Sequence, residues 1–463
     1  MAVNLEELPL PDELPVLPDG WRYESLADLV EERGLSYGIV QPGSETSDGV
    51  PIVRVNNIRN GRIDTADMLK VTADIEAKFQ RSRLRGGEVL LTLVGTLGEV
   101  AIVPDNLRGW NVARAVGVIP VRKDPGSLWV SICLRSAFIQ HCIRTWAMTT
   151  VQSTFNLRDL AKLPIPIPPT ATREAIAAVL GALDDKIELN RRMNATLEAM
   201  ARALFQSWFV DFDPVRAKLD GRKPIGLDET TAALFPDSFE NSELGHIPKG
   251  WNVRALSDLT SLITKGTTPT QDDMAGAPDP DAQINYVRVN SIDEDGSVLA
   301  DKLTTIPESV HAGVLKRSIL MANDVLYTIA GTIGRLALAE DWMLPANTNQ
   351  AVAIIRPEPE IPSGFLILTM RHEVFRKELH NNIVQAVQAN LSLGMLSKAR
   401  VVVPPQSILQ QLFRPIDALL SQISANRAQS RTLATLRDTL LPKLLSGELS
   451  VAASLASTRE RST

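Results

Sequence analysis

The stretch TREAIAAVLGALDDKIELNRRMNATLEAMARALFQSWFVDFDP, residues 172–214, decides the fold of this chain. Apolar side chains follow one another along it at steps of four and three, which predicts one long helix with a heptad seam. The seam is apolar at both ends and polar in the middle. Its positions are Ile176, Leu180, Leu183, Ile187, Asn190, Asn194, Leu197, Ala201, Leu204 and Trp208.

A second copy of this pattern lies 236 residues further along the chain, and Asn426 stands where the first copy has Asn190. An asparagine inside a helical seam costs stability but fixes register, because its amide is satisfied only opposite another polar group. We therefore predict that the two helices pair and that Asn190 and Asn426 set their register. The second seam consists of Leu412, Ile416, Leu419, Ile423, Asn426, Ser430, Leu433, Arg437, Leu440 and Leu444.

The duplication extends through nearly the whole chain. Each half starts with Pro-x-Gly-Trp, in LPDGW (17–21) and IPKGW (247–251). The stretch EVLLTLVGTLGEVAIVP (88–104) matches DVLYTIAGTIGRLALAE (324–340), and proline pairs close both globular parts before the helices. Two similar halves, each a globular part followed by a long helix, are therefore expected.

The globular parts mix short β-branched runs with helical patterns, which predicts an α+β fold. We expect the two helices to pair antiparallel with pseudo-two-fold symmetry, because a linker must carry the chain back between the halves. The predicted segments are a disordered acidic tail (1–16), a first globular domain (17–170), the first long helix (171–214), a linker (215–246), a second globular domain (247–405), the second long helix (406–449) and a flexible tail (450–463).

Charge is spread unevenly along a chain whose formal net charge is −6. Residues 1–49 hold two basic and eleven acidic side chains, residues 50–163 hold 16 and 9, and residues 251–405 hold 13 and 17. The basic block in the first globular domain favours contact with phosphates, and a solvated surface with a chance imbalance is the alternative.

Composition and the N-terminus indicate a cytoplasmic protein. No window of 18 apolar residues occurs, and the start MAVNLEELPLPDELP is acidic, so neither a transmembrane span nor a signal peptide is expected. The two cysteines, Cys133 and Cys142, argue against a disulfide framework and fit a reducing compartment.

The ordered set of motifs resembles the specificity (S) subunit of type I restriction-modification systems over nearly the whole chain. Besides the Pro-x-Gly-Trp starts, it rests on the GTLG and GTIG turns, the exits IPIPP and VVVPP, and the segments SWFVDFDP (207–214), LFPDSFENSELGHIPKGW (234–251) and LLPKLLSGEL (440–449). The resemblance implies two target recognition domains separated by two antiparallel helices, reading the two halves of a bipartite target in double-stranded DNA. It also implies that two methyltransferase (M) subunits and, for cleavage, motor-nuclease (R) subunits are recruited.

No catalytic residue and no metal site are predicted in this chain. It lacks the N/D-P-P-Y/F loop of amino-type adenine methyltransferases and the G-x-x-x-x-G-K-[ST] loop of translocases, and its five histidines fall at no ligand spacing. Asp211 and Asp213 are interpreted as residues that end the helix rather than as metal ligands. The resemblance implies that S-adenosylmethionine, ATP and Mg²⁺ are bound by the partner subunits.

Candidate DNA-binding residues come from their side-chain chemistry, since arginine matches guanine and asparagine or glutamine matches adenine in the major groove. An exposed hairpin without a partner and a solvated face are the alternatives for the two stretches of the first domain. The candidates there are Arg54, Asn56, Asn57, Arg59 and Arg62 in RVNNIRNGR and Arg81, Arg83 and Arg85 in QRSRLR.

The second domain offers a counterpart in TKGTTPTQ, where Gly266 is expected to let the backbone approach a phosphate, with a surface loop as the alternative. The GTLG and GTIG turns are interpreted as hairpin architecture rather than anion nests. Gln152 and Gln388 either reach DNA or cap strand ends. The second-domain candidates are Lys265, Thr267, Thr268, Gln271, Arg288, Asn290 and Ser291.

The long helices offer more apolar surface than one pairing consumes. Docking of methyltransferase helices is the use that the resemblance implies, and burial against the chain's own globular domains is the alternative. The apolar residues outside the first seam are Val179, Leu189, Met193, Met200, Phe205 and Phe209.

Two other functions compete with a non-catalytic DNA specificity subunit. One is a helical spacer that tethers two protein partners without nucleic acid, and the other is a DNA-binding module detached from an active system. If the helices act as a ruler, removing one heptad from each, 183–189 and 419–425, is expected to shorten the interval between half-sites by about three base pairs.

Overall fold

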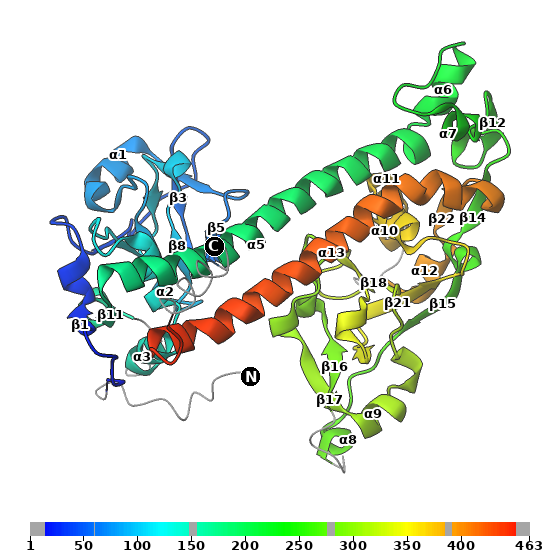
Figure 1. Cartoon of the computed structure of the whole chain (residues 1–463). Coiled ribbons are helices and arrows are strands. Elements are labelled where there is room, and N and C mark those ends of the chain that lie inside the picture. The colour runs from blue at the N-terminus through cyan, green and yellow to red at the C-terminus, as the bar shows by residue number, and fades with distance from the viewer. Residues whose placement is uncertain (1–13, 60, 148–154, 276–282, 385–390, 451–463) are drawn as a thin grey trace, which may run out of the picture. The chain divides into compact units, whose positions relative to one another are not determined.

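The computed structural model describes residues 14–59, 61–147, 155–275, 283–384 and 391–450. The predictions for Gln152 and Gln388, and most of those for the two tails, lie outside these residues. The chain divides into two compact units, residues 1–190 with 428–463 (unit 1) and residues 191–427 (unit 2). Both long helices therefore contribute to each unit (Figure 1).

Unit 1 is built around a four-stranded antiparallel sheet in the order β2-β10-β7-β8. Alternate residues of strand β7 face different cores on the two sides of the sheet, as a pleated strand requires. Val89 and Leu91 pack with α2 and α3, whereas Leu90 packs on the opposite face. The strands are β2 (Ser36–Tyr37), β10 (Val116–Ile119), β7 (Val89–Thr92) and β8 (Val100–Ile102), and the helices are α2 (Ser127–Leu134) and α3 (Ala137–Ala147).

Smaller elements complete the first domain. The first and last strands pair antiparallel and bring the Trp21 turn beside the exit of the domain. The remaining elements are β1 (Arg22–Ser25) with β11 (Pro164–Ile167), the sheet β6 (Leu69–Val71), β3 (Val50–Val53) and β9 (Asn111–Val112), the hairpin β4 (Ile58–Arg59) and β5 (Arg62–Ile63), and the helices α1 (Ala73–Glu76) and α4 (Leu157–Lys162).

Unit 2 repeats this architecture in the same strand order, so the α+β duplication predicted from the sequence is confirmed. Its central sheet is β15 (Thr260–Lys265), β21 (Val352–Pro357), β18 (Val325–Thr328) and β19 (Leu336–Leu338), with β14 (Asn252–Ala255) and β22 (Arg400–Val403) paired beside it. A third sheet joins β17 (Thr304–Pro307), β16 (Gln283–Val287) and β20 (Ala346–Thr348). The helices are α8 (Gln271–Ala275), α9 (Glu308–Ala312), α10 (Ser363–Arg371), α11 (Glu373–Val384) and α12 (Leu393–Lys398).

The long helices are α5 (Thr170–Phe205) and α13 (Gln406–Leu445). The first ends earlier than residue 214, where the sequence pattern places its end. A π-helical turn follows at Gln206–Val210, Phe212 takes a left-handed conformation with φ 54°, and α6 (Asp213–Leu219) has Pro214 in its first turn. Phe205, Phe209 and Phe212 are all buried in unit 2, so packing of this aromatic cluster ends the helix.

The two helices run antiparallel in each unit. In unit 1, Asn190 Nδ2 donates to Gln429 Oε1 at 2.9 Å and to Ser430 Oγ at 3.2 Å. In unit 2, Asn426 Nδ2 donates to Asn194 Oδ1 at 2.8 Å. The partner's number falls as the number on α5 rises, which confirms the predicted orientation. Asn190 thus lies opposite Gln429 and Ser430 in unit 1, and Asn426 lies opposite Asn194 in unit 2.

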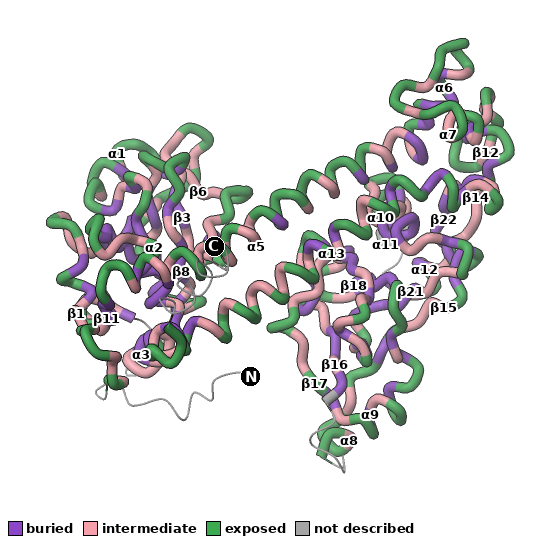
Figure 2. Tube along the Cα trace, in the orientation of Figure 1, coloured by how far each residue is buried: buried purple, intermediate pink, exposed green. Residues whose placement is uncertain are grey.

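The predicted linker, 215–246, has regular structure of its own. It contains most of α6, then α7 (Glu229–Ala233), and a hairpin of β12 (Phe239–Ser242) and β13 (Gly245–Pro248). Phe235 packs edge-on against Trp208, with ring centroids 5.7 Å apart, and is 2% exposed. This segment is therefore part of the core of unit 2. Figure 2 shows buried stretches alternating with exposed ones along it and along both long helices.

Candidate nucleic-acid interface

The same tight turn presents candidate residues in both domains. Single 3-10 turns follow Arg54 and Arg288, and each is closed by a side chain that accepts from the arginine's own N–H. Asn57 Oδ1 accepts at 3.0 Å and Ser291 Oγ at 3.2 Å. Asn57 is 3% exposed and its Nδ2 donates to the Asp67 carbonyl at 2.9 Å. Burial therefore gives Asn57 and Ser291 a structural role in the turn.

The turns leave one exposed asparagine each, Asn56 and Asn290. The neighbouring guanidinium groups are partly buried. Arg54 pairs with Asp67 at 3.0 Å, and its Nε, like that of Arg288, has no hydrogen-bond partner in the described part of the chain. The exposed amides of Asn56 and Asn290 suit contact with base edges, whereas the Nε atoms of both arginines are buried.

The hairpin β4–β5 separates its two arginines. Arg59 is exposed, whereas Arg62 Nε lies 2.7 Å from Glu188 Oε2 of α5. The side chains of this pair are 34% and 31% exposed. Arg62 therefore contacts the long helix of its own unit.

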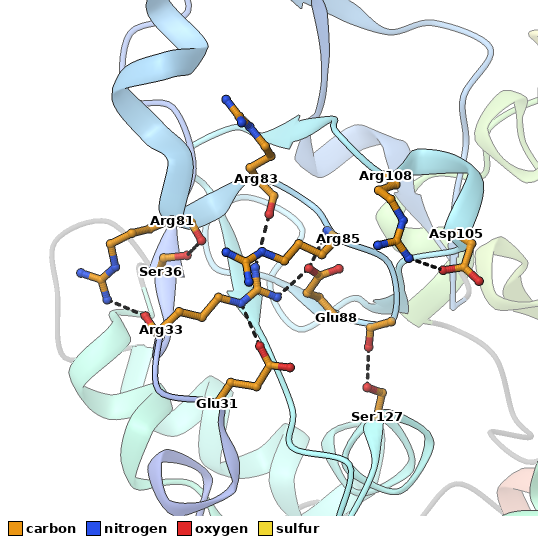
Figure 3. Close-up of polar contacts among 11 residues, drawn as sticks. Glu31, Arg33, Ser36, Arg81, Arg83, Arg85, Glu88, Asp105, Arg108 and Ser127 are labelled. Carbon is orange, nitrogen blue, oxygen red and sulfur yellow. Dashed lines mark hydrogen bonds and ion pairs between the residues drawn. The ribbon is translucent and has the colours of Figure 1, made fainter.

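The backbone of the stretch that carries Arg81, Arg83 and Arg85 is bonded by two charged side chains, Arg33 and Glu88 (Figure 3). Arg33 donates to Glu88 at 2.6 Å and to the Arg83 carbonyl at 3.3 Å, and Glu88, whose side chain is 1% exposed, accepts from the Arg85 N–H at 2.7 Å. This network fixes the backbone of the stretch. The sequence did not reveal the network, because Arg33 and Glu88 lie outside the basic motif.

The three arginine side chains differ in their freedom. Arg81 donates to the Arg33 carbonyl at 2.9 Å, and Arg83 Nε donates to Glu76 Oε1 at 2.7 Å. The hydrogen bond from Arg83 holds the pKa of Glu76 below its ordinary value. Arg85 is exposed, with no side-chain partner in the described ranges. Arg85 is thus the member of the trio whose guanidinium is available to a phosphate.

In the second domain, the TKGTTPTQ stretch leaves the end of β15. Lys265, Thr267, Thr268 and Gln271 are exposed, and Gln271 begins α8. Tyr286 Oη donates to the Thr267 carbonyl at 2.8 Å, and Thr268 donates to Gln350. These contacts anchor the loop while its lysine and glutamine stay exposed.

Gly266 serves the fold of its own domain, and this corrects the expectation of a close approach to phosphate. It is buried, and a Cβ placed on it would lie 1.5 Å from the Thr348 carbonyl oxygen. Gly38 meets the Val112 carbonyl in the same way, at 1.9 Å. Since Val112 and Thr348 are equivalent residues of the two halves, the glycine is an architectural feature of both domains.

The GTLG and GTIG turns are hairpin connections, as predicted, between β7 and β8 and between β18 and β19. The Gly98 N–H donates to the Thr92 carbonyl and the Gly334 N–H to the Thr328 carbonyl, both at 3.0 Å. A threonine hydroxyl closes each turn by accepting from a backbone N–H at 2.9 Å.

The apolar residues outside the first helical seam divide into two groups. Phe205 and Phe209 are 4% and 5% exposed and belong to the core of unit 2, so they offer no docking surface. The other four stay exposed at the surface of α5, namely Val179 (37%), Leu189 (43%), Met193 (39%) and Met200 (48%).

No group of three or more possible metal ligands occurs among the residues that the structure describes. The two carboxylates that follow the π-helical turn are used locally, since Asp211 accepts from Gln206 at 2.9 Å and Asp213 accepts from Ser207 at 2.7 Å. Cys133 and Cys142 are free and buried, and burial raises the pKa of Cys142 to about 11. Within the described ranges, no helix has the length and hydropathy needed to cross a membrane.

The sequence of both halves matches one family model, the type I restriction modification DNA specificity domain, over residues 18–199 and 248–433. The chain belongs to this family. As a specificity subunit it recognises DNA and has no catalytic activity of its own. The duplicated domains and the antiparallel helices described above are the parts of this subunit.

Relatives of the specificity subunit come from bacteria and archaea. It is 28% identical over 340 residues to the type I restriction enzyme HindI specificity subunit of Haemophilus influenzae, covering 65% of this chain and 72% of that one. It is 25% identical over 369 residues to the MjaIX specificity subunit of Methanocaldococcus jannaschii, covering 79% and 78%. A crystal structure of a type I S subunit from M. genitalium aligns over 94% of this chain and 99% of that one, at 14% identity and a TM-score of 0.49.

Proposed function

We propose that each recognition domain reads one half of a bipartite target in double-stranded DNA, while α5 and α13 set the interval between the half-sites. The observation that carries this proposal is the duplication itself. Equivalent turns present Arg54 with Asn56 and Arg288 with Asn290, and each domain is built onto the same antiparallel helix pair. Two equivalent readers in one chain, each built onto the same two helices, suit a target of two separated parts.

The contacts divide by chemistry. The exposed amides of Asn56, Asn290 and Gln271 are assigned to base edges, since a planar amide pairs with adenine in the major groove. Arg59, Arg85 and Lys265 are assigned to phosphates, which position the domain without carrying sequence information. The first domain holds more of the cations, so its half-site contributes more of the salt-dependent affinity.

Two methyltransferase subunits are the proposed partners on the helices. The exposed Leu189, Met193 and Met200 follow one another along α5 at steps of four and seven, which places them near one face of the helix. Methionine-rich exposed stripes suit helical partners because the side chain adapts its shape. The full assembly, with motor-nuclease subunits, would bind S-adenosylmethionine, ATP and Mg²⁺ on those partners and act in the cytoplasm.

The test is a binding scan of the full chain, together with its methyltransferase subunit, on fragmented genomic DNA. Two short half-sites at a fixed interval are the expected result. Binding that is indifferent to sequence would support the rival function, a helical spacer that tethers two protein partners without reading nucleic acid.

A second experiment tests whether the domains act as modules. Residues 20–168 are replaced by the equivalent domain of a relative with a different target, which leaves both long helices intact. Only one half-site is expected to change. If both half-sites change, the domains do not read separately.

A further inference from the structure

Each recognition domain is attached to the long helices of its own unit by an apolar core to which both helices contribute. In unit 1, Ile176 and Leu180 of α5 are 1% exposed and share a core with α2 and α3. In unit 2, Leu412 and Ile416 of α13 are fully buried and join the core around α10. The apolar contact of unit 1 lies within residues 175–183 and 440–445 of the two helices.

The hairpin β4–β5 provides a second attachment in unit 1. Arg62 reaches Glu188, which lies eight residues beyond Leu180 and therefore about 12 Å further along α5. A Cβ placed on Gly61 would lie 3.6 Å from Arg135 Nη1, and Arg135 pairs with Asp184 of α5 at 2.9 Å. The hairpin and the end of α2 thus meet the helix beyond the apolar contact.

Asp184 extends this attachment to the other helix, because it also accepts from Arg437 of α13 at 2.8 Å. Both side chains of that pair are about one-quarter exposed, at 26% and 25%. One carboxylate therefore joins the domain to both long helices of unit 1.

Unit 2 has an equivalent attachment built from different charges. The turn between Ile292 and Val298 corresponds to β4–β5. Its Asp295 carbonyl accepts from Arg427 of α13 at 3.4 Å and from Arg371 at 3.5 Å, and Arg427 pairs with Glu198 of α5 at 3.0 Å. Arg371 is the equivalent of Arg135 in the duplication. The same place in the fold therefore contacts the helices in both units.

The charges on the two turns are opposite. Where the first carries Arg59 and Arg62, the second carries Asp293, Glu294 and Asp295, and Arg335 pairs with Glu294 at 3.4 Å. The position of Arg335 is occupied in the first half by Glu99. Each turn thus carries charges opposite to those of the residues it contacts, Glu188 in unit 1 and Arg335 in unit 2.

We propose that the turns β4–β5 and 292–298 are positioning elements, which fix the orientation of each recognition domain on the helices and so restrict the interval between half-sites that the subunit accepts. Arg62 is then a positioning residue that acts through Glu188 rather than a contact to DNA. This inference rests on the proposed reading of a bipartite target.

The experiment compares Arg62→Glu, Glu188→Arg and the double exchange Arg62→Glu with Glu188→Arg in the full chain with its methyltransferase subunit. Each protein is tested on DNA in which the interval between half-sites varies one base pair at a time. The single exchanges are expected to lower the preference for the natural interval over its neighbours by about 5-fold, the scale of one partly exposed ion pair. The double exchange is expected to restore it.

Arg59→Glu is the matched control, because Arg59 sits on the same hairpin but is exposed. It is expected to weaken binding at every interval equally and to reduce the salt dependence. If Arg62→Glu behaves in that way, Arg62 contacts phosphate and the positioning role is wrong. A single exchange that leaves the interval preference unchanged overturns it too.

Two further measurements keep the outcomes distinct. The midpoint of thermal unfolding is recorded for each variant, and Arg62→Gln with Glu188→Gln replaces any charge reversal that does not fold. A wild-type chain with no preferred interval would reject the proposed bipartite function. A wild-type chain with a preferred interval that these variants do not relax would reject only the positioning role.

Discussion

The layer formed by Asn194 and Asn426 offers the sharpest test of how the long helices hold their register. Asn426 Nδ2 donates to Asn194 Oδ1 at 2.8 Å, and Gln422 Nε2 donates to Asn426 Oδ1 at 2.9 Å. Asn426 is 5% exposed, so water cannot readily replace a lost acceptor. Asn194→Leu is therefore expected to cost about 1–3 kcal/mol, because it removes one partner of a buried hydrogen bond.

The double variant Asn194→Leu with Asn426→Leu is expected to recover this loss and to exceed the wild type in stability, because two leucines pack well in a seam. It should also accept a wider range of half-site intervals, since the polar layer no longer specifies one register. Hydrogen exchange at the helix amides near both positions measures the local stability of each variant. The reasoning is refuted if Asn194→Leu is as stable as the wild type, or if the two substitutions are simply additive.

If the long helices set the distance between half-sites, deleting the facing heptads 183–189 and 431–437 removes about 10.5 Å of helix. The preferred interval should then shorten by about three base pairs of about 3.4 Å each. An unchanged interval, measured on DNA with varied spacing between half-sites, would exclude this role of the helices. Gly266→Ala is expected to destabilise unit 2 by about 3 kcal/mol or more, because the new Cβ would collide with the Thr348 carbonyl. Gly394→Ala is the control, since its Cβ has room, and its free energy of unfolding should rise by up to about 1 kcal/mol. Thermal unfolding of both variants measures the difference. The pKa of Glu76 is lower in the folded protein than in the unfolded chain, where it is about 4.3. Ionised Glu76 therefore stabilises the fold at a pH above about 4.3, and this stabilisation is lost as the pH falls through the folded pKa. The wild type should therefore lose more stability in acid than Glu76→Gln, and parallel pH curves for the two would contradict this.

The structure changes which residues such a deletion must remove. The sequence pairs 183–189 with 419–425, because those stretches are equivalent in the duplication. In an antiparallel pair, equivalent residues do not face one another. Asp184 lies against Arg437, and Asn190 against Ser430, so the segment that faces 183–189 is 431–437. Removing the equivalent stretches would also change which residues face one another between the two deletions.

The sequence also did not predict which side chains contact one another. Arg59 and Arg62 look alike in IRNGRI, yet one is exposed and the other pairs with a helix far along the chain. Asn57 resembles Asn56 but closes a turn from inside. The recurrence of Asn111 and Asn347 at the 236-residue offset could have indicated a buried polar contact common to both domains. Asn111 accepts from Ser82, and Asn347 donates to the equivalent Ser318. No comparable signal marked Glu76 or Glu88.

The sequence by itself determined the duplication, the α+β class and the two long helices, because periodicity and repetition can be read along the chain. The antiparallel pairing was an expectation from the linker, and contacts between the helices confirmed it. The sequence also determined membership of the specificity family through motifs that recur in order. Only the tertiary structure decided where α5 ends, which residues form the polar layers, and which arginines remain available to DNA. Those outcomes depend on groups that folding brings together from distant parts of the chain, and no spacing along the sequence records them.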